Sequence, residues 1–130
     1  MSNINDTKII HGDCLKVLPT IPSASVDLIL TDPPYYRVKN IDWDRQWTTS
    51  SAFLEWIGKI ADEWARVLKP NGSLYCFASS KMHGRVELEL AQRFNVLNSI
   101  TWQKPSGGHC RAHKEGLRSY FAASERILFC

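Results

Sequence analysis

A short apolar run, Val26–Leu30, followed at once by Thr31-Asp32-Pro33-Pro34-Tyr35, constrains the fold of this chain more than any other feature. A run of this length that is bounded by turn residues predicts a buried strand of a parallel sheet. In an open α/β sheet, the ligand crevice lies beyond the carboxyl ends of the strands. The sequence therefore predicts a carboxylate, two prolines and an aromatic ring beside that crevice.

The rest of the chain predicts an alternation of helices and strands. Apolar residues recur at helical spacing from Ser51 to Leu68, and Lys69–Gly72 forms a turn that leads into a strand over Ser73–Ala78. Three later elements are expected, namely a helix over Lys81–Phe94 and strands over Val96–Trp102 and Arg126–Cys130. This order fits a doubly wound α/β sheet with an antiparallel hairpin at one edge.

The residues after the first of these strands suit chemistry on the exocyclic amino group of a nucleobase. The lone pair of that group is delocalised into the ring, so the nitrogen is a weak nucleophile until acceptors bind its hydrogens. Asp32 can accept one hydrogen and the Pro33 carbonyl the other, with Pro34 keeping the turn extended and preorganised. Tyr35 offers a stacking face for a base flipped out of double-stranded DNA. An ordinary turn after a core strand is the structural alternative.

Asp32-Pro33-Pro34-Tyr35 after a hydrophobic strand resembles the catalytic motif of the DNA amino-methyltransferases, which use S-adenosylmethionine. Asp in the first position is more similar to the adenine-specific members than to the cytosine-specific ones. The resemblance implies direct transfer of a methyl group to the amino group of adenine, as in restriction-modification systems. Such a transfer requires no covalent enzyme intermediate, so no Cys or Ser nucleophile is expected.

The N-terminal segment resembles the same family. Lys8–His11 is expected to form a short strand, followed by a Gly-Asp turn and the start of a helix. In the family, the carboxylate at this point meets the adenine amino group of the cofactor. The resemblance therefore implies a cofactor site that includes Asp13, Cys14 and Asp32. Asp is also a preferred N-cap residue, and Asp13 can serve both roles.

The resemblance extends over nearly the whole chain, through Arg66–Leu74, Trp102–Pro105 and Ser124–Leu128. Two family features are missing from the sequence: a Phe-x-Gly-x-Gly loop for the methionine end of the cofactor, and an acidic residue for its ribose. In one circularly permuted class, the catalytic half precedes the glycine-rich half. We therefore expect residues 1–130 to form a single partial catalytic domain, with an incomplete Rossmann-like methyltransferase sheet. A second chain or a missing C-terminal half would complete it.

Two basic segments are candidates for contact with DNA. The stretch 104–118 is rich in glycine and cations and has one acid, which predicts contacts with phosphates; a solvated loop is the alternative. The irregular stretch 36–49 mixes cations with Trp43 and Trp47 and predicts a lid or substrate contact, unless both rings cap the core. The predicted DNA contacts are Arg37, Lys39, Lys104, Arg111, Lys114 and Arg118.

Composition excludes some classes of protein. The net charge of +3 by itself says little about nucleic acid. No apolar run reaches the ~20 residues of a membrane span and no signal peptide is evident, so we expect a cytoplasmic protein without membrane contact. The four cysteines lack a disulfide framework. The cluster His109–His113 does not supply four metal ligands, so no metal is expected.

Two other functions remain open on the sequence. One is methylation of the cytosine amino group, against which only the Asp at position 32 argues. The other is a non-catalytic remnant that binds nucleic acid or a partner protein.

Overall fold

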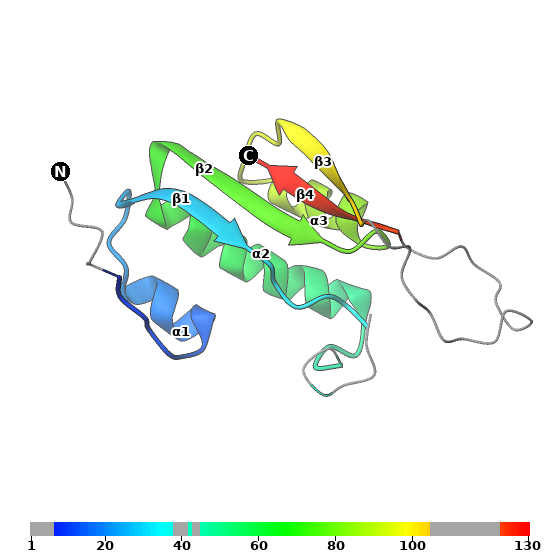
Figure 1. Ribbon diagram of the computed structural model, residues 1–130. Coiled ribbons are helices and arrows are strands. Elements are labelled where there is room, and N and C mark those ends of the chain that lie inside the picture. The colour runs from blue at the N-terminus through cyan, green and yellow to red at the C-terminus, as the bar shows by residue number, and fades with distance from the viewer. Residues whose placement is uncertain (1–6, 38–41, 43–44, 105–122) are drawn as a thin grey trace, which may run out of the picture.

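The computed structural model describes residues 7–37, 42, 45–104 and 123–130, which form a four-stranded sheet with helices on one face (Figure 1). The strands are β1 (Val26–Thr31), β2 (Leu68–Ala78), β3 (Asn98–Gln103) and β4 (Ser124–Phe129). The helices are α1 (Cys14–Val17), the 3-10 helix η1 (Leu18–Thr20), α2 (Ser50–Val67) and α3 (His83–Leu90). Among the described residues, no helix is long and apolar enough to cross a membrane.

The sheet has the strand order β1-β2-β4-β3. β1 and β2 are parallel and are joined through α2, whereas β4 is antiparallel to both β2 and β3. The antiparallel hairpin expected at one edge is therefore confirmed. Because β4 is antiparallel to β1 and β2, its first residues lie beside the carboxyl ends of β1 and β2.

Helix α2 confirms the predicted helix to within one residue at each end. Thr49 caps its first turn, because the Thr49 hydroxyl accepts a hydrogen bond from the Ala52 N–H at 3.1 Å. Its buried stripe consists of Phe53, Ile57, Gly58, Ile60, Ala61, Trp64 and Val67. Gly58 faces α3: a Cβ there would lie 2.5 Å from Glu89 Oε1, so a larger residue would require the Glu89 side chain to shift.

The strand expected over Lys8–His11 is not formed, and this prediction was wrong. The segment has no regular structure, with Ile9 and Ile10 exposed at 91% and 50%. A strand needs a neighbour to accept its backbone hydrogen bonds, and no described strand lies beside this segment. Local sequence pattern alone therefore does not make Lys8–His11 a strand.

Other boundaries differ because turns interrupt the expected elements. β2 starts at Leu68, but Val26 pairs with Leu68 and Leu28 already pairs with Ser73, so the predicted turn Lys69–Gly72 survives as a bulge within β2. Helix α3 is shorter than the predicted Lys81–Phe94 because tight turns flank it. β3 and β4 start two residues later and two residues earlier, respectively, than predicted.

The core lies between the sheet and α2 and α3. The sheet contributes Leu74, Cys76 and Leu128 to it, each at 0% exposure, and the helices contribute Ile57 and Leu90, also at 0%. Side chains alternate along a strand, so the residues between these core positions point to the opposite face. A doubly wound sheet has helices on both faces, and this expectation is not met within the described residues, whose helices cover one face.

The uncovered side, here called the open sheet face, is apolar. Leu30 is 68% exposed on it, and Leu28 is 54% exposed. Two aromatic contacts bridge its strands: Tyr75 stacks on Phe129 at 4.6 Å between ring centroids, and Phe77 meets Trp102 edge-on at 6.1 Å. The open sheet face consists of Leu28, Leu30, Tyr75, Phe77, Ile100, Trp102, Ile127 and Phe129.

We predict that Ile57→Ala lowers the free energy of unfolding by about 2–5 kcal/mol, because it leaves a cavity where α2 meets the sheet. Leu88→Ala is the matched control: Leu88 is 72% exposed on α3, and its truncation should change stability by less than about 0.5 kcal/mol. Urea unfolding of the two variants measures the difference. Equal losses would contradict the assignment of Ile57 to the core.

Candidate active site

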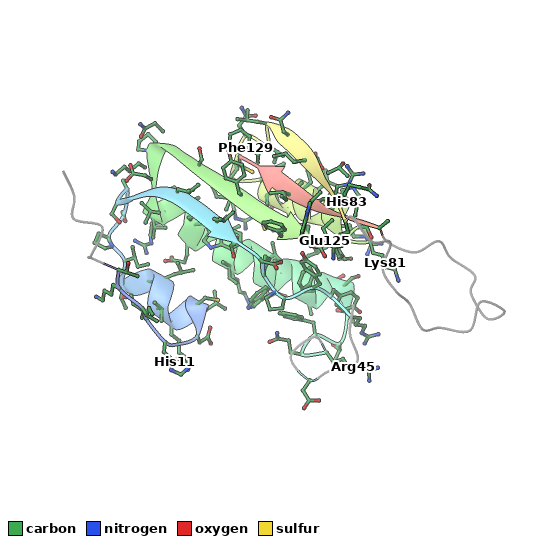
Figure 2. All side chains as sticks on the ribbon, viewed as in Figure 1. His11, Arg45, Lys81, His83, Glu125 and Phe129 are labelled. Carbon is green, nitrogen blue, oxygen red and sulfur yellow. The ribbon has the colours of Figure 1, made fainter. Side chains whose placement is uncertain are left out.

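The candidate site lies at the end of the sheet where the carboxyl ends of β1 and β2 meet the start of β4. Asp32–Tyr35 follow β1 directly and form no regular secondary structure. Ala78 at the end of β2 pairs with Arg126 of β4, which brings Glu125 to the same edge. Figure 2 shows Glu125 beside the C-terminal end of β2. The parallel β1–α2–β2 unit and the antiparallel β4 therefore converge on one site.

Tyr35 is held at this edge by a hydrogen bond. Its hydroxyl donates to Glu125 Oε2 at 3.1 Å, and the other carboxylate oxygen of Glu125 pairs with the Lys104 ammonium. The same ammonium lies over the Trp102 ring, 5.5 Å from its centroid. Burial, and then the neighbouring carboxylates of Asp32 and Glu125, raise the pKa of Tyr35 above its usual value. The phenol therefore stays protonated and acts as a donor.

Asp32 and Pro33 present acceptors to solvent. The Asp32 side chain is exposed, although its carboxylate is close enough to raise the pKa of the Tyr35 phenol. The Pro33 carbonyl accepts no hydrogen bond from the described residues, and the proline ring offers no N–H that would compete with it. Asp32 and Pro33 thus supply two acceptors from adjacent residues at the carboxyl end of β1.

The two prolines also line an apolar cavity beneath the motif. The hydroxyl of Ser79 is buried in its wall and has no hydrogen-bond partner among the described residues. The cavity is lined by Pro33, Pro34, Tyr35, Phe53, Ile57, Phe77, Ala78, Ser79, Met82 and Val86. As the alternative interpretation of the turn expected, the prolines therefore contact the core, and this packing supports the backbone that carries the Asp32 and Pro33 acceptors.

Asp13 is the N-cap of α1, since its carboxylate accepts from the Leu15 N–H at 3.0 Å. Asp13 and Cys14 are both exposed. No hydrogen bond or ion pair of the described part of the chain joins either residue to Asp32 or Tyr35. Figure 2 shows the nearby His11 well apart from Glu125. Direct contacts of the described residues thus link Tyr35 with Glu125 and include neither Asp13 nor Cys14.

Arg66, at the end of α2, holds the segment that carries Asp13. Its guanidinium donates to the carbonyls of Leu18 and Ile21, both at 2.9 Å. It also pairs with Glu63 at 2.7 Å. An arginine can reach several acceptors at once because its five N–H donors spread in a plane. Arg66 is therefore a structural anchor for the α1–η1 segment.

Sequence reasoning did not single out Arg66, Glu125 or Ser79. Arg66 and Glu125 lie in segments that resemble the methyltransferase family, and this resemblance was the only available signal for them. The sequence around a single charged residue does not indicate a partner that is 90 positions away, as Tyr35 is from Glu125.

Arg37 and Lys104, the predicted DNA contacts that lie among the described residues, engage groups of the protein itself. Arg37 donates to the Thr48 carbonyl at 2.7 Å and its guanidinium lies 5.3 Å from the Tyr36 ring centroid. Lys104 is paired with Glu125. Trp47 is 8% exposed and meets Phe53 and Trp56, which supports the alternative in which this ring caps the core. Predicted site residues outside the described residues are Lys39, Arg111, Lys114 and Arg118, as is Trp43.

Two of the described cysteines, Cys76 and Cys130, are poor nucleophiles. Burial raises the pKa of Cys76 to about 12, with smaller effects of Cys130 and Asp32 in the same direction. Burial likewise raises the pKa of Cys130 to about 11. Both thiols are therefore protonated near neutral pH. Within the described residues, no three His, Cys, Asp or Glu side chains are grouped to hold a metal ion, and His109–His113 lies outside them.

The chain belongs to the N6_N4_Mtase family of DNA methylases, whose family model matches residues 26–130. It is 38% identical over 105 residues to DNA adenine methyltransferase YhdJ of Escherichia coli (strain K12), covering 80% of this chain and 36% of YhdJ. It is 37% identical over 95 residues to Type II methyltransferase M.BamHI of Bacillus amyloliquefaciens, covering 72% of this chain and 22% of M.BamHI.

Solved structures share the fold. TTHA0409 of Thermus thermophilus, complexed with S-adenosyl-L-methionine, superposes with a TM-score of 0.65 at 25% identity, covering 91% of this chain and 50% of that protein. The cytosine-N4-specific PvuII DNA methyltransferase superposes with a TM-score of 0.70 at 20% identity, covering 91% and 46%. The sheet is thus part of an S-adenosylmethionine-dependent DNA methyltransferase fold, and the chain spans about half of these structures.

We predict that iodoacetamide modifies the exposed Cys14 before the buried Cys76 in the native protein and leaves Cys76 intact at pH 8.5. The thiolate is the reactive form, and a pKa raised to about 12 leaves almost no thiolate at Cys76 at that pH. Unfolding in urea should expose Cys76 and restore its ordinary reactivity. Peptide mass spectrometry measures the order, and native labelling of Cys76 as fast as that of Cys14 would contradict it.

Proposed function

We propose that this chain is the catalytic part of an enzyme that transfers a methyl group from S-adenosylmethionine to the exocyclic amino group of adenine in double-stranded DNA. The observation that carries the proposal is the site at the end of β1. There the exposed carboxylate of Asp32 and the free carbonyl of Pro33 stand beside a Tyr35 ring of fixed position. Membership of the DNA methylase family supports methyl transfer as the reaction.

The described residues can bind part of the cofactor. The exposed carboxylates of Asp13 and Asp32 are acceptors of the kind that its amino groups need, whereas the Phe-x-Gly-x-Gly loop is absent from this sequence. When bound, S-adenosylmethionine supplies an electrophilic methyl group on a sulfonium. Asp13 can use the carboxylate oxygen that the Leu15 N–H leaves free, so capping α1 and binding the cofactor are compatible.

The residues of the motif activate the acceptor nitrogen. Asp32 and the Pro33 carbonyl each accept one amino hydrogen, which draws the lone pair out of conjugation with the ring. The nitrogen then forms the bond to the methyl carbon as the carbon–sulfur bond breaks, and its electron pair remains on sulfur. Asp32 accepts the proton that the nitrogen loses, while Tyr35 stacks on the flipped base. No thiol or hydroxyl nucleophile takes part.

Adenine is favoured over cytosine by two observations. Asp32 opens the motif, and YhdJ, which is named a DNA adenine methyltransferase, is 38% identical to the matched part of the chain. The cytosine-N4-specific PvuII enzyme is only 20% identical, so that likeness concerns the fold. Transfer to the cytosine amino group is the second candidate, because the same acceptors suit both bases.

We predict that Asp32→Ala lowers kcat for DNA methylation by more than about 100-fold, since it removes one preorganised acceptor from the reacting nitrogen. Asp27→Ala is the matched control: Asp27 is exposed on the same strand and forms only a surface pair with Lys69, so its loss should leave kcat unchanged.

The assay uses the complete polypeptide encoded by the gene, labelled cofactor and nucleoside analysis of the methylated DNA. The expected product is N6-methyladenine, and N4-methylcytosine would select the second candidate. An Asp32→Ala variant with a normal rate would overturn the proposed mechanism.

We further propose that a glycine-rich cofactor half, in the same polypeptide or in a second chain, covers the open sheet face and pairs with β1. β1 has a neighbour on one side only within the described residues, and Leu28 and Leu30 are exposed beside that free edge. Free strand edges and contiguous apolar surface favour association with another polypeptide. The solved relatives are about twice as long as this chain, which supports a second half of similar size.

We predict that Leu30→Glu abolishes binding of S-adenosylmethionine by the complete polypeptide, since a buried charge at this face would displace the cofactor half. Leu88→Glu is the control, because Leu88 is as exposed as Leu30 but lies on α3. Calorimetric titration with the cofactor measures both variants. Equal binding would show that the open sheet face is not covered, and no saturable heat in the unmodified protein would favour the non-catalytic remnant.

A further inference from the structure

Tyr35 is connected to the edge hairpin through a chain of three polar contacts. Its hydroxyl donates to Glu125 Oε2 at 3.1 Å, Glu125 Oε1 pairs with the Lys104 ammonium, and Lys104 lies 5.5 Å from the Trp102 ring centroid. The side chain of Glu125 is 18% exposed and that of Lys104 is 38% exposed. Pairs with this degree of shielding are weakened less by solvent than open surface pairs.

Glu125 is held in place from two sides. Its backbone pairs with Trp102 across the β3–β4 ladder, which fixes the position of its Cα. Its carboxylate is then fixed by Lys104, so the oxygen that faces Tyr35 has little rotational freedom. A hydrogen bond to a charged acceptor is stronger than one between neutral groups. Glu125 can therefore orient the Tyr35 ring without contacting a substrate itself.

The orientation of Tyr35 matters because the backbone that carries the other two groups of the site is constrained. Pro33 and Pro34 line the apolar cavity and their rings fix the backbone φ angle, which limits the positions of the Pro33 carbonyl and of the Asp32 backbone. A flat ring that stacks on Tyr35 meets both acceptors only if the Tyr35 ring lies in one plane. A tyrosine has two rotatable side-chain bonds, and the hydroxyl contact limits both.

We propose that Glu125 and Lys104 are positioning residues that set the plane of the Tyr35 ring against the extruded base, and that Lys104 acts on Glu125 and not on a DNA phosphate. The inference rests on the proposed function, because it requires a base to be held at Asp32–Tyr35. It also assigns a role to Lys104 that differs from the phosphate contact expected from its place in a basic segment.

The first experiment compares Glu125→Gln, Tyr35→Phe and the double variant in the complete polypeptide. We expect each single change to lower kcat/KM for DNA about 10-fold, the effect of one hydrogen bond to a charged group, with the cofactor Kd unchanged. The double variant should be no worse than Tyr35→Phe, because both changes remove the same contact. Additive losses would overturn the coupling.

Thr101→Val is the matched control. Thr101 accepts a hydrogen bond from Arg126 in the neighbouring rung of the same β3–β4 ladder, so its loss removes a cross-strand contact that does not reach Tyr35. We expect kcat/KM of this variant to equal that of the unmodified protein. Equal losses in Thr101→Val and Glu125→Gln, with equal drops in thermal midpoint, would mean that Glu125 only stabilises the hairpin.

The second experiment measures the salt dependence of DNA binding by Lys104→Met. A lysine that neutralises one phosphate contributes about 0.9 to the slope of log K against log salt concentration. We expect the slope to be unchanged while kcat/KM falls as in Glu125→Gln. A slope that is shallower by about 0.9 would overturn the role of Lys104 and assign it to a phosphate.

The third readout does not depend on activity. Glu125→Gln replaces the charged acceptor of the Tyr35 hydroxyl by a neutral one, so the ring carbon signals of Tyr35 should shift at neutral pH, whereas Thr101→Val should leave them unchanged. NMR of ring-labelled tyrosine measures this shift, and Tyr35→Phe assigns the signal. An unmodified protein that methylates no DNA would refute the proposed function, whereas an active protein whose Glu125→Gln variant works normally would refute the positioning role alone.

Discussion

The packing of α2 on the parallel pair β1–β2 is the constraint on which the rest of the structure depends. The apolar stripe of the helix, centred on Ile57, buries the core face of both strands. Because β1 and β2 are parallel, their carboxyl ends lie at the same end of the sheet. Phe53 and Ile57 then continue into the wall of the cavity beneath Pro33 and Pro34. Core and candidate site are therefore built on the same helix face.

The sheet is covered asymmetrically, and this asymmetry links stability to assembly. One face carries the buried core, and the other is an apolar surface strengthened by the Tyr75–Phe129 and Phe77–Trp102 ring contacts. Aromatic side chains of this size gain free energy when a partner removes their apolar surface from water. The same lack of a neighbour leaves Lys8–His11 without a strand and gives β1 a free edge.

The chemistry of the site follows from its charges. Burial, and then the carboxylates of Asp32 and Glu125, raise the pKa of Tyr35 and keep the phenol protonated and able to donate. The thiol of Cys76 is likewise kept protonated by burial. Acceptors in such a site can bind the hydrogens of an amino group and thereby activate its nitrogen. Protonated thiol and phenol groups, by contrast, do not suit covalent catalysis. The positioning contact between Tyr35 and Glu125 belongs to the same arrangement, because it needs the phenolic proton.

The sequence by itself determined the elements whose information is local. The periodicity of residues 51–68 specified α2, the apolar run before Asp32 specified β1, and the motif at its end specified the acceptors of the candidate site. Tertiary structure alone decided that Glu125 meets Tyr35, that Lys104 turns inward to Glu125, that Arg66 anchors the segment of Asp13 and that Lys8–His11 forms no strand. The reason is that a side-chain pair or a strand depends on a partner distant in sequence, whereas a helix stripe and a proline turn are encoded within a few residues.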